Sequence, residues 1–391
     1  MMTNYPESVN RRDTNSVKWD VGRDELPMTI ADMDFKTSPA IIQAMQDKLQ
    51  LGAFGYEEIP DEYFNAVADW YEQRHGFKPQ TDWMIFTTGV VPAISSAVRR
   101  LTSIGDNVLV QAPVYNIFYN SIVNSGRHVL SSDLVYDAQT HAYSVDWQDL
   151  EAKLANPLTN LMILCNPHNP MGIIWTRDQL IRLAKLCNQY HVTIFSDEIH
   201  GDFTFNQTGY VPMFSLPLEL IQNVEVAVSP SKTFNVAALH AATVIVPNAN
   251  LRGQVSRGLN SEELAEPNLM AIPGTIAAYE DGSSWLDHVL AAIQANRKLV
   301  NDFVQEQFAG RVAVVPGEAT YLLWLDVSKL TNDSTKLAAF IRKQTGLILS
   351  AGAIYGGNGN SFLRMNVACS DKAVLTGLDR LARGITEWQN R

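Results

Sequence analysis

Cysteine is scarce in this chain of 391 residues, with three copies, at positions 165, 187 and 369. They are far apart, odd in number and form no Cys-x-x-Cys pair, so neither a disulfide framework nor a zinc site is indicated, and we expect no metal. A reducing compartment suits such a chain. The polar start, from Met1 to Arg12, also lacks the apolar core of a signal peptide. We therefore expect a cytoplasmic location.

Long runs of positive charge and of apolar residues are missing as well. The formal net charge is −11, and no basic run is longer than a pair such as Arg11-Arg12, which argues against a nucleic-acid surface. No stretch approaches the ~20 apolar residues that a membrane-spanning helix needs. Hydrophobic residues make up 46% of the chain, which is enough for a large core. We expect a globular protein with neither nucleic-acid nor membrane partners.

Short apolar runs of strand length alternate with helical patterns through the middle of the chain. Buried strands separated by helices predict a largely parallel sheet covered on both faces, which is an α/β fold of three layers. The expected strands are 85–88, 108–110, 161–165, 192–195, 224–228 and 242–246, and the expected helices include 39–51, 61–75, 92–98, 114–123 and 177–190.

The pattern of predicted elements changes after Gly310. Residues 261–307 are helical in pattern, and the later residues predict strands at 312–315, 321–325, 347–349 and 363–367 with helices at 335–345 and 371–387. This pattern indicates a smaller α+β domain at 286–391 beside a large domain at 49–285. Because chain ends often lie near each other, we expect the N-terminal segment 1–48 to join the small domain.

The strand expected at 224–228 leads directly into Ser229-Pro230-Ser231-Lys232. Pro230 ends the strand because proline cannot donate to a sheet ladder, so Lys232 lies on a short turn at a strand's end, where open α/β sheets bind ligands. A lysine in such a place can form an imine with a carbonyl cofactor, and the serines can donate to a phosphate. The alternative is an exposed loop lysine with two turn serines.

A possible anion site lies at Thr88-Gly89-Val90-Val91-Pro92, where a short strand meets glycine and a helix opens at Pro92. The free N–H groups and the dipole at a helix start attract phosphate. An ordinary strand-to-helix turn is the alternative.

Three further loops carry polar side chains near strand ends. Asn169 lies between two X-Pro steps, where its amide can donate to a phenolate, or it belongs to a simple proline-rich turn. Asp197 ends a buried strand and needs a cationic partner such as a protonated pyridine, unless it only caps a helix. Arg364 lies within an apolar strand and suits a carboxylate, unless that strand is at an edge. Together with Lys232 these groups match the needs of pyridoxal phosphate acting on an amino acid.

The chain resembles a known family over nearly its whole length. It is similar to the fold-type I pyridoxal-phosphate enzymes of the class I/II aminotransferase superfamily, and within it to the MalY/PatB branch of cystathionine β-lyases (C–S lyases). The segments that carry the resemblance are Leu26-Pro27-Met28, Ala31-Asp32-Met33-Asp34-Phe35, Phe54-Gly55-Tyr56, Thr88-Gly89-Val90-Val91-Pro92, Cys165-Asn166-Pro167-His168-Asn169-Pro170, Ser196-Asp197-Glu198-Ile199-His200 and Ser231-Lys232-Thr233-Phe234-Asn235. The resemblance implies the fold of pyridoxal-phosphate-dependent transferases.

The resemblance also implies roles around the ring of pyridoxal 5′-phosphate. Lys232 would form the imine and move protons, and Asp197 would pair with the ring nitrogen. Asn169, with His200, would face the ring hydroxyl, and Tyr115 would stack on the ring. Lys232, Asp197 and Tyr115 are therefore the residues expected to act in catalysis.

The same resemblance implies a phosphate site that two subunits share. Val90 and Val91 would offer backbone N–H groups, Ser229 and Ser231 their hydroxyls, and Tyr56 would reach the phosphate of the other subunit of a homodimer.

The substrate side follows the branch less closely. Arg364, with Asn169, would bind the substrate carboxylate. His240 stands where aminotransferases often have an arginine beside the phosphate, and Thr29-Ile30 stands where the branch often has tryptophan and an aliphatic residue. The expected partner is therefore a small-molecule amino-acid substrate, and the residues do not specify which thiol leaves from it.

Three functions follow from the resemblance. The first is a C–S β-lyase that cleaves cystathionine or cysteine conjugates to a thiol, pyruvate and ammonia. The second is an aminotransferase. The third is a regulatory protein that binds a partner, because MalY in this branch also binds a transcription activator.

Overall fold

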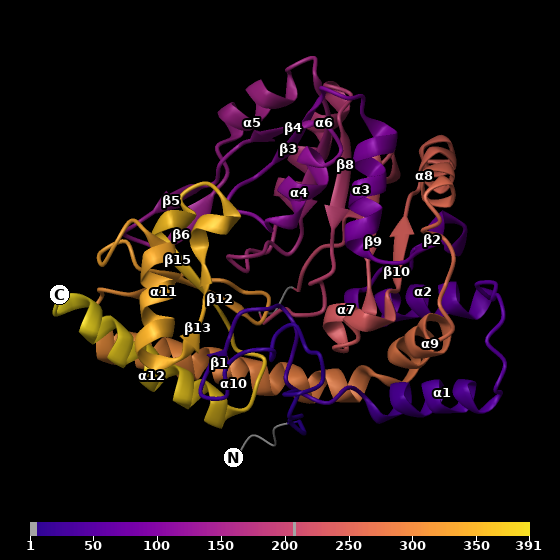
Figure 1. Ribbon diagram of the computed structural model, residues 1–391. Helices are drawn as coiled ribbons and strands as arrows, with labels where there is room; N and C mark the ends of the chain where they lie inside the picture. Colours follow the sequence, from indigo (N-terminus) through magenta and orange to yellow (C-terminus); the bar gives the residue numbers. More distant parts are fainter. Residues whose placement is uncertain (1–5, 206–208) are drawn as a thin grey trace.

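The computed structural model describes residues 6–205 and 209–391, and a mixed β-sheet forms its centre (Figure 1). In the described part of the chain this sheet has seven strands in the order β2-β10-β9-β8-β7-β3-β4. β10 pairs antiparallel with both neighbours, whereas the other pairs are parallel, so the prediction of a mostly parallel sheet is confirmed. The bounds are β2 Met84–Thr87, β3 Asn107–Val110, β4 His128–Ser131, β7 Thr159–Cys165, β8 Thr193–Asp197, β9 Val224–Val228 and β10 Ala242–Ile245.

Helices cover both faces of the sheet, as expected for three layers. Successive strand residues point to opposite faces. Leu161 and Ile163 of β7 accordingly pack with α3 (Val90–Leu101), α4 (Ile117–Val123) and α8 (Ala249–Ser261). Met162 and Leu164 of the same strand pack on the other face, which is covered by α2 (Asp61–His75), α5 (Trp147–Leu154), α6 (Arg177–Gln189) and α9 (Ala271–Asp281).

A smaller antiparallel sheet follows in the C-terminal part, drawn in yellow in Figure 1. Its order is β11-β12-β15-β14, with β11 Ala313–Val314, β12 Leu322–Asp326, β14 Ser350–Ala351 and β15 Phe362–Asn366. Around it lie α10 (Ser283–Phe308), α11 (Ser334–Thr345) and α12 (Asp371–Gln389). A hairpin of β5 (Val135–Asp137) and β6 (Ala142–Ser144) reaches it from the large sheet, because Tyr136 donates to Asp326 Oδ2 at 2.6 Å.

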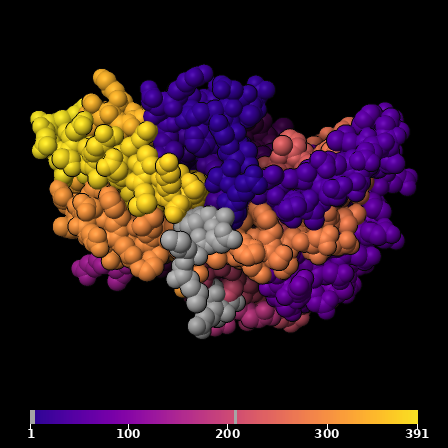
Figure 2. Space-filling model, turned by 90° about the horizontal axis from the view of Figure 1, so that it is seen from below, coloured from indigo at the N-terminus to yellow at the C-terminus, as the bar shows by residue number. Residues whose placement is uncertain are grey.

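The N-terminal segment lies beside the C-terminal part of the chain. β1 (Leu26–Pro27) pairs in parallel with β13 (Leu347–Ile348), and Arg380 of α12 donates to the carbonyl of Asp24 at 2.7 Å. Figure 2 shows the indigo N-terminal residues against the yellow C-terminal ones. After β1 the chain turns to α1 (Pro39–Gln50), which packs on α9. The domain limits at 48/49 and 285/286 stay a prediction.

Three expected element bounds are wrong, each for a local reason. α3 begins at Val90 and not at Pro92, because the Gly89 carbonyl already accepts from the Ala93 N–H at 3.1 Å. α4 begins three residues after Val114, whose N–H bonds instead to the Tyr355 carbonyl at 2.8 Å. The stretch 262–270 is not helical, because α8 ends at Ser261 and α9 begins at Ala271.

Candidate functional site

A cavity of about 280 Å³ lies where β7, β8 and β9 end and α3 begins. Polar side chains collect here because parallel strands bring their carboxyl ends to one edge. Most of the residues predicted to form the site line this cavity, namely Val90, Val91, Tyr115, Asn169, Asp197, His200, Ser231 and Lys232.

Lys232 is held by a one-turn helix, α7 (Pro230–Thr233), that follows β9 directly. Ser229 is its N-cap and accepts from the Ser231 N–H at 3.1 Å, while Pro230 takes the first helical position, where proline is favoured. The amine of Lys232 points into the cavity region and donates to the Ala31 carbonyl at 2.6 Å. The alternative of an exposed loop lysine is wrong.

Burial is the main influence on the charge of this amine. Burial lowers the pKa of Lys232, and the charge of Arg364 lowers it further, whereas the carboxylates of Asp32 and Asp197 raise it. A lysine whose pKa is lowered is a better nucleophile and proton acceptor near neutral pH than a surface lysine.

Asp197 is the last residue of β8 and is buried at the cavity wall. Burial raises its pKa to about 6, while the Ile199 N–H and the charge of Lys232 act in the opposite direction. The Ile199 N–H donates to Oδ1 at 3.2 Å, so the carboxylate also stabilises the turn after the strand. A cationic N–H group in the cavity would give this carboxylate a charged hydrogen-bond donor.

His200 and Asn169 form the floor beside Asp197. Burial lowers the pKa of His200 to about 3, so its ring is neutral, and its Nδ1 atom has no hydrogen-bond partner within residues 6–205 and 209–391. The carboxamide oxygen of Asn169 accepts from Arg364 Nη1 at 3.1 Å. Its Nδ2 is therefore the donor that remains for a ligand. Tyr115 completes this wall, and burial raises the pKa of its hydroxyl.

The start of α3 faces the other end of the cavity. Val90 and Val91 lie in its first turn, where backbone N–H groups have no helical acceptor. The earlier start of the helix thus places both of these residues, rather than Pro92, at the dipole's positive end. Ser231 and His240 line the same region.

Ser229 and Tyr56 do not line the cavity. Ser229 Oγ donates to the Ala241 carbonyl at 2.6 Å and lies 2.8 Å from Ser231 Oγ, which fixes the turn that carries Lys232. Tyr56 lies in the loop between α1 and α2, and its side chain is fully exposed in this single chain.

Arg364 is in β15, between β12 and β14, and is buried. The alternative of an edge strand is therefore wrong. Its Nη2 donates to the Thr29 carbonyl at 3.1 Å, its guanidinium lies 4.9 Å from the centre of the Tyr355 ring, and its Nε atom has no partner in the described chain. Arg364 does not line the cavity itself but reaches it through Asn169.

The sequence analysis did not predict that the backbone of residues 29–34 contributes to the site. Ala31 lines the cavity, and its carbonyl accepts from both Lys232 and Tyr321, the latter at 3.0 Å. Every residue type has a backbone carbonyl, so the residue types of this loop could not reveal the contribution.

The residues present fit the cofactor that the resemblance implies. An aldehyde would meet the Lys232 amine, a pyridine nitrogen would meet the carboxylate of Asp197, which accepts only one backbone N–H within the described residues, and a phosphate would meet the start of α3. The unpartnered Nδ1 of buried His200 is a further polar atom that awaits a ligand.

Comparison with known proteins agrees with this geometry. The sequence profile of the family "Aminotransferase class I and II" matches residues 23–381. The chain belongs to this family. It is 37% identical to cystathionine beta-lyase PatB of Bacillus subtilis, over 98% of this chain and all of that protein, and 31% identical to protein MalY of Escherichia coli, over 98% of this chain and 99% of that one.

The fold is also that of a solved enzyme. The crystal structure of cystalysin from Treponema denticola, which contains a pyridoxal 5′-phosphate cofactor, superposes with a TM-score of 0.94. It is 28% identical and covers 99% of this chain and all of that chain. The predicted transferase fold is thereby confirmed.

Within residues 6–205 and 209–391, no group of three or more His, Cys, Asp or Glu side chains is arranged to hold a metal ion. None of the helices in these ranges combines the length and apolar character that crossing a bilayer requires.

Proposed function

We propose that the protein is a pyridoxal 5′-phosphate-dependent C–S β-lyase that cleaves cystathionine or related cysteine conjugates to a thiol, pyruvate and ammonia. The observation that carries the proposal is the placement of the Lys232 amine and the buried Asp197 carboxylate in one cavity. The full-length similarity to a protein named cystathionine beta-lyase supports the choice of reaction.

Binding and orientation come from the residues described above. Val90, Val91 and Ser231 would hold the phosphate, and Tyr115 would pack on the ring. Arg364, kept in place by Thr29 and Asn169, would bind the substrate carboxylate, since its planar guanidinium suits bidentate contacts.

Proton transfer would rest on two residues. When bound, the cofactor ring takes up the electron pair left by loss of the α-proton. Asp197 would hold a proton at the ring nitrogen, which increases the ring's capacity for that pair. Lys232 would accept the α-proton as general base, helped by burial that lowers its pKa. A β-lyase then releases a thiolate from the β-carbon.

An aminotransferase is the second candidate, and the family to which the chain belongs favours it. The same cavity serves both reactions until the proton has left the α-carbon. Turnover on cystathionine, cysteine and alanine, with and without 2-oxoglutarate, separates them. We expect pyruvate and thiol from cystathionine without 2-oxoglutarate, and turnover that needs 2-oxoglutarate would instead support the aminotransferase. A purely regulatory protein would not need Lys232 and Asp197 to line one cavity.

We also propose a homodimer with C₂ symmetry, in which Tyr56 reaches the phosphate of the other subunit. Leu49, Leu51, Phe54 and Tyr56 form an exposed apolar stretch, and such stretches mark association surfaces. His240 lines the cavity at the sequence position where aminotransferases often have an arginine for the phosphate, so the site needs another donor, which Tyr56 of a second chain would supply. A cytoplasmic location stays a prediction.

A further inference from the structure

Residues 29–34, here called the 29–34 loop, supply backbone acceptors to the candidate site. The Thr29 carbonyl accepts from Arg364 at 3.1 Å and the Ala31 carbonyl from Lys232 at 2.6 Å. Asn366 Nδ2 donates to the carbonyls of Ile30 and Asp32, at 2.6 and 2.7 Å. The position of this loop therefore determines whether Lys232 and Arg364 have these hydrogen-bond acceptors.

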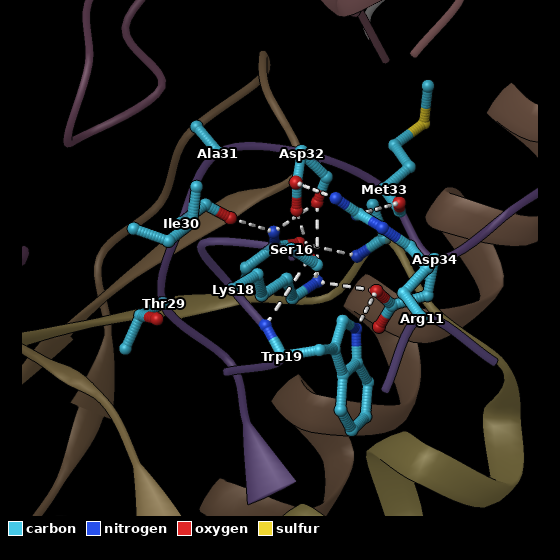
Figure 3. Close-up of polar contacts among 12 residues, drawn as sticks. Arg11, Ser16, Lys18, Trp19, Thr29, Ile30, Ala31, Asp32, Met33 and Asp34 are labelled. Carbon is cyan, nitrogen blue, oxygen red and sulfur yellow. Dashed lines mark hydrogen bonds and ion pairs between the residues drawn. The ribbon is translucent and has the colours of Figure 1, made fainter. Parts of the chain in front are cut away.

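The opposite side of the 29–34 loop is held by an ion cluster from the N-terminal segment. Lys18 Nζ lies 3.0 Å from Asp34 Oδ1, 3.7 Å from Asp32 Oδ1 and 3.3 Å from the Asp32 carbonyl oxygen. Arg11 Nη2 lies 2.8 Å from Asp32 Oδ2, and Trp19 Nε1 donates to Asp34 Oδ1 at 2.8 Å. Figure 3 shows Arg11, Lys18 and Trp19 pointing toward the two carboxylates.

Lys18 is the buried member of this cluster. Its side chain is 1% exposed, whereas that of Arg11 is 26% exposed. A buried ammonium is costly unless it is paired, so the energy of burying Lys18 is recovered only while Asp32 and Asp34 stay in position. The cluster has two cations, Arg11 and Lys18, and two anions, Asp32 and Asp34, so its charges balance.

Asp32 connects the cluster to the site. Its negative charge is the strongest charge effect that raises the pKa of Lys232. Lys18 and Arg11 offset this charge from the other side of the loop, and the buried Oδ1 of Asp32 has no hydrogen-bond partner within the described residues. The charge of Lys18 can therefore influence the protonation of Lys232 through Asp32, without direct contact.

We propose that Lys18 is a positioning residue of the site. First, it holds the 29–34 loop so that the carbonyls of Thr29 and Ala31 accept from Arg364 and Lys232. Second, its positive charge limits how strongly the Asp32 carboxylate stabilises the protonated form at Lys232. The first part depends on the contacts of the loop alone. The second part rests on the proposed function, in which Lys232 bears the cofactor.

Hydrogen exchange of the holoenzyme without substrate tests the first part. The N–H groups of Asp32, Met33 and Asp34 are bonded to Ile30, Asn235 and Ala368 and report directly on the loop. In Lys18→Met we expect their exchange to be faster by about tenfold or more, because local opening becomes easier. The matched control is Lys36→Met, which removes the same charge from the same segment at an exposed ion pair with Glu7. Its exchange should equal that of wild type.

The pH titration of the cofactor's visible absorbance tests the second part. Lys232 faces Asp32 from the loop, Asp197 from β8, His200 from the turn after it and Arg364 from β15. Removing the Lys18 cation strengthens the effect of Asp32, so the protonated form persists to higher pH. We expect an upward shift of about half a unit or more in Lys18→Met and none in Lys36→Met.

Arg11→Gln is the second variant, since Arg11 is partly exposed and its loss leaves the buried pair intact. It should also give faster exchange and an upward titration shift, both smaller than in Lys18→Met. If Lys18→Met does not fold, Arg11→Gln provides the test. Equal exchange in Lys18→Met and Lys36→Met would overturn the positioning role. If Lys18→Met does not fold, equal exchange in Arg11→Gln and Lys36→Met would overturn it. Faster exchange without a shift in titration would overturn the electrostatic part alone. If wild type shows no absorbance band, the proposed function fails while the exchange result still stands.

Discussion

The candidate cavity has two walls that are built by different means. The sheet wall, formed by strand ends and helix starts, presents side chains such as Asp197 and Lys232. The loop wall, formed by Ala31 of the 29–34 loop with Arg364 of β15 behind it, presents mainly backbone carbonyls to the site cations. Most residues of the sheet wall lie at the ends of buried strands or in the turns and helices that follow them, whereas the loop wall has no regular structure between β1 and α1.

Because of this difference, the groups that would carry out the chemistry and the groups that orient them lie on different walls. Groups that accept or release protons lie on the sheet wall, where a regular scaffold holds them. The loop wall supplies the carbonyls that accept from Lys232 and Arg364, and it is held by Lys18, which lies 16 positions before Asp34 in the chain. We therefore expect changes on the sheet wall to affect mainly kcat, and changes on the loop wall to affect substrate binding and pH dependence.

The largest effect is expected on the sheet wall at Lys232. Under the proposed function, Lys232→Ala removes the amine that would form the imine and act as general base, so turnover should fall by about 10³-fold or more. The rate of pyruvate formation measures this, and the visible cofactor absorbance should change with it. Full activity in this variant would remove the central claim of the proposed function.

Asp197→Asn should reduce kcat by about 10²–10³-fold, because an amide cannot keep the ring nitrogen protonated. Its urea unfolding midpoint should change little. Burial raises the pKa of Asp197 to about 6, so in protein freed of cofactor the carboxylate is ionised above that pH and neutral below it. Cofactor affinity, measured by absorbance titration, should accordingly fall as pH drops below about 6. An unchanged rate and spectrum would reduce Asp197 to a turn-stabilising residue.

Arg364→Lys tests the loop wall. Lysine keeps the charge but not the fork of donors that reaches Asn169 and Thr29. We expect KM to rise by about 10–100-fold with a smaller change in kcat, as for loss of a charged hydrogen bond. If kcat falls and KM does not, the assignment of binding to this wall is wrong.

Mixed dimers test whether a second chain completes the sheet wall. Lys232→Ala and Tyr56→Ala homodimers should both be impaired, but a mixed dimer would have one site with both defects and one wild-type site. Unfolding and refolding equal amounts together should therefore restore activity at about a quarter of all sites. No gain, despite proven mixed dimers and an impaired Tyr56→Ala, would contradict the shared site.

The smallest effect on catalysis is expected at Glu225, one strand away from Asp197 in the interior of the same sheet. Burial raises its pKa from 4.5 to about 8, and neither of its oxygens has a partner within the described residues. The folded state thus holds a proton that the unfolded state releases between these values, so stability should fall as pH rises from 4.5 to 8. Glu225→Gln should remove up to about 1.4 kcal/mol per pH unit of this slope in urea unfolding, and leave kcat unchanged.

Much of the sheet wall could be predicted from residue patterns. The apolar run 224–228 and Pro230 together determine where β9 stops and Lys232 begins its turn. Asp197 and Asn169 were recognisable for the same reason, because each follows an apolar strand. The start of α3 was misplaced by two residues, since Pro92 suggests a first helical position while the Gly89 carbonyl already accepts a helical bond.

The sequence by itself determined which residues end strands and which can do chemistry, because apolar runs, proline and glycine act within a few residues. Tertiary structure alone decided which backbone carbonyls meet the site cations. Lys232 and Ala31 are 201 positions apart, and Arg364 and Thr29 are 335 positions apart. It also decided that Lys18 is buried against Asp32 and Asp34 rather than solvated. Such contacts depend on how separate segments of the chain pack together, and residue type alone does not predict that packing.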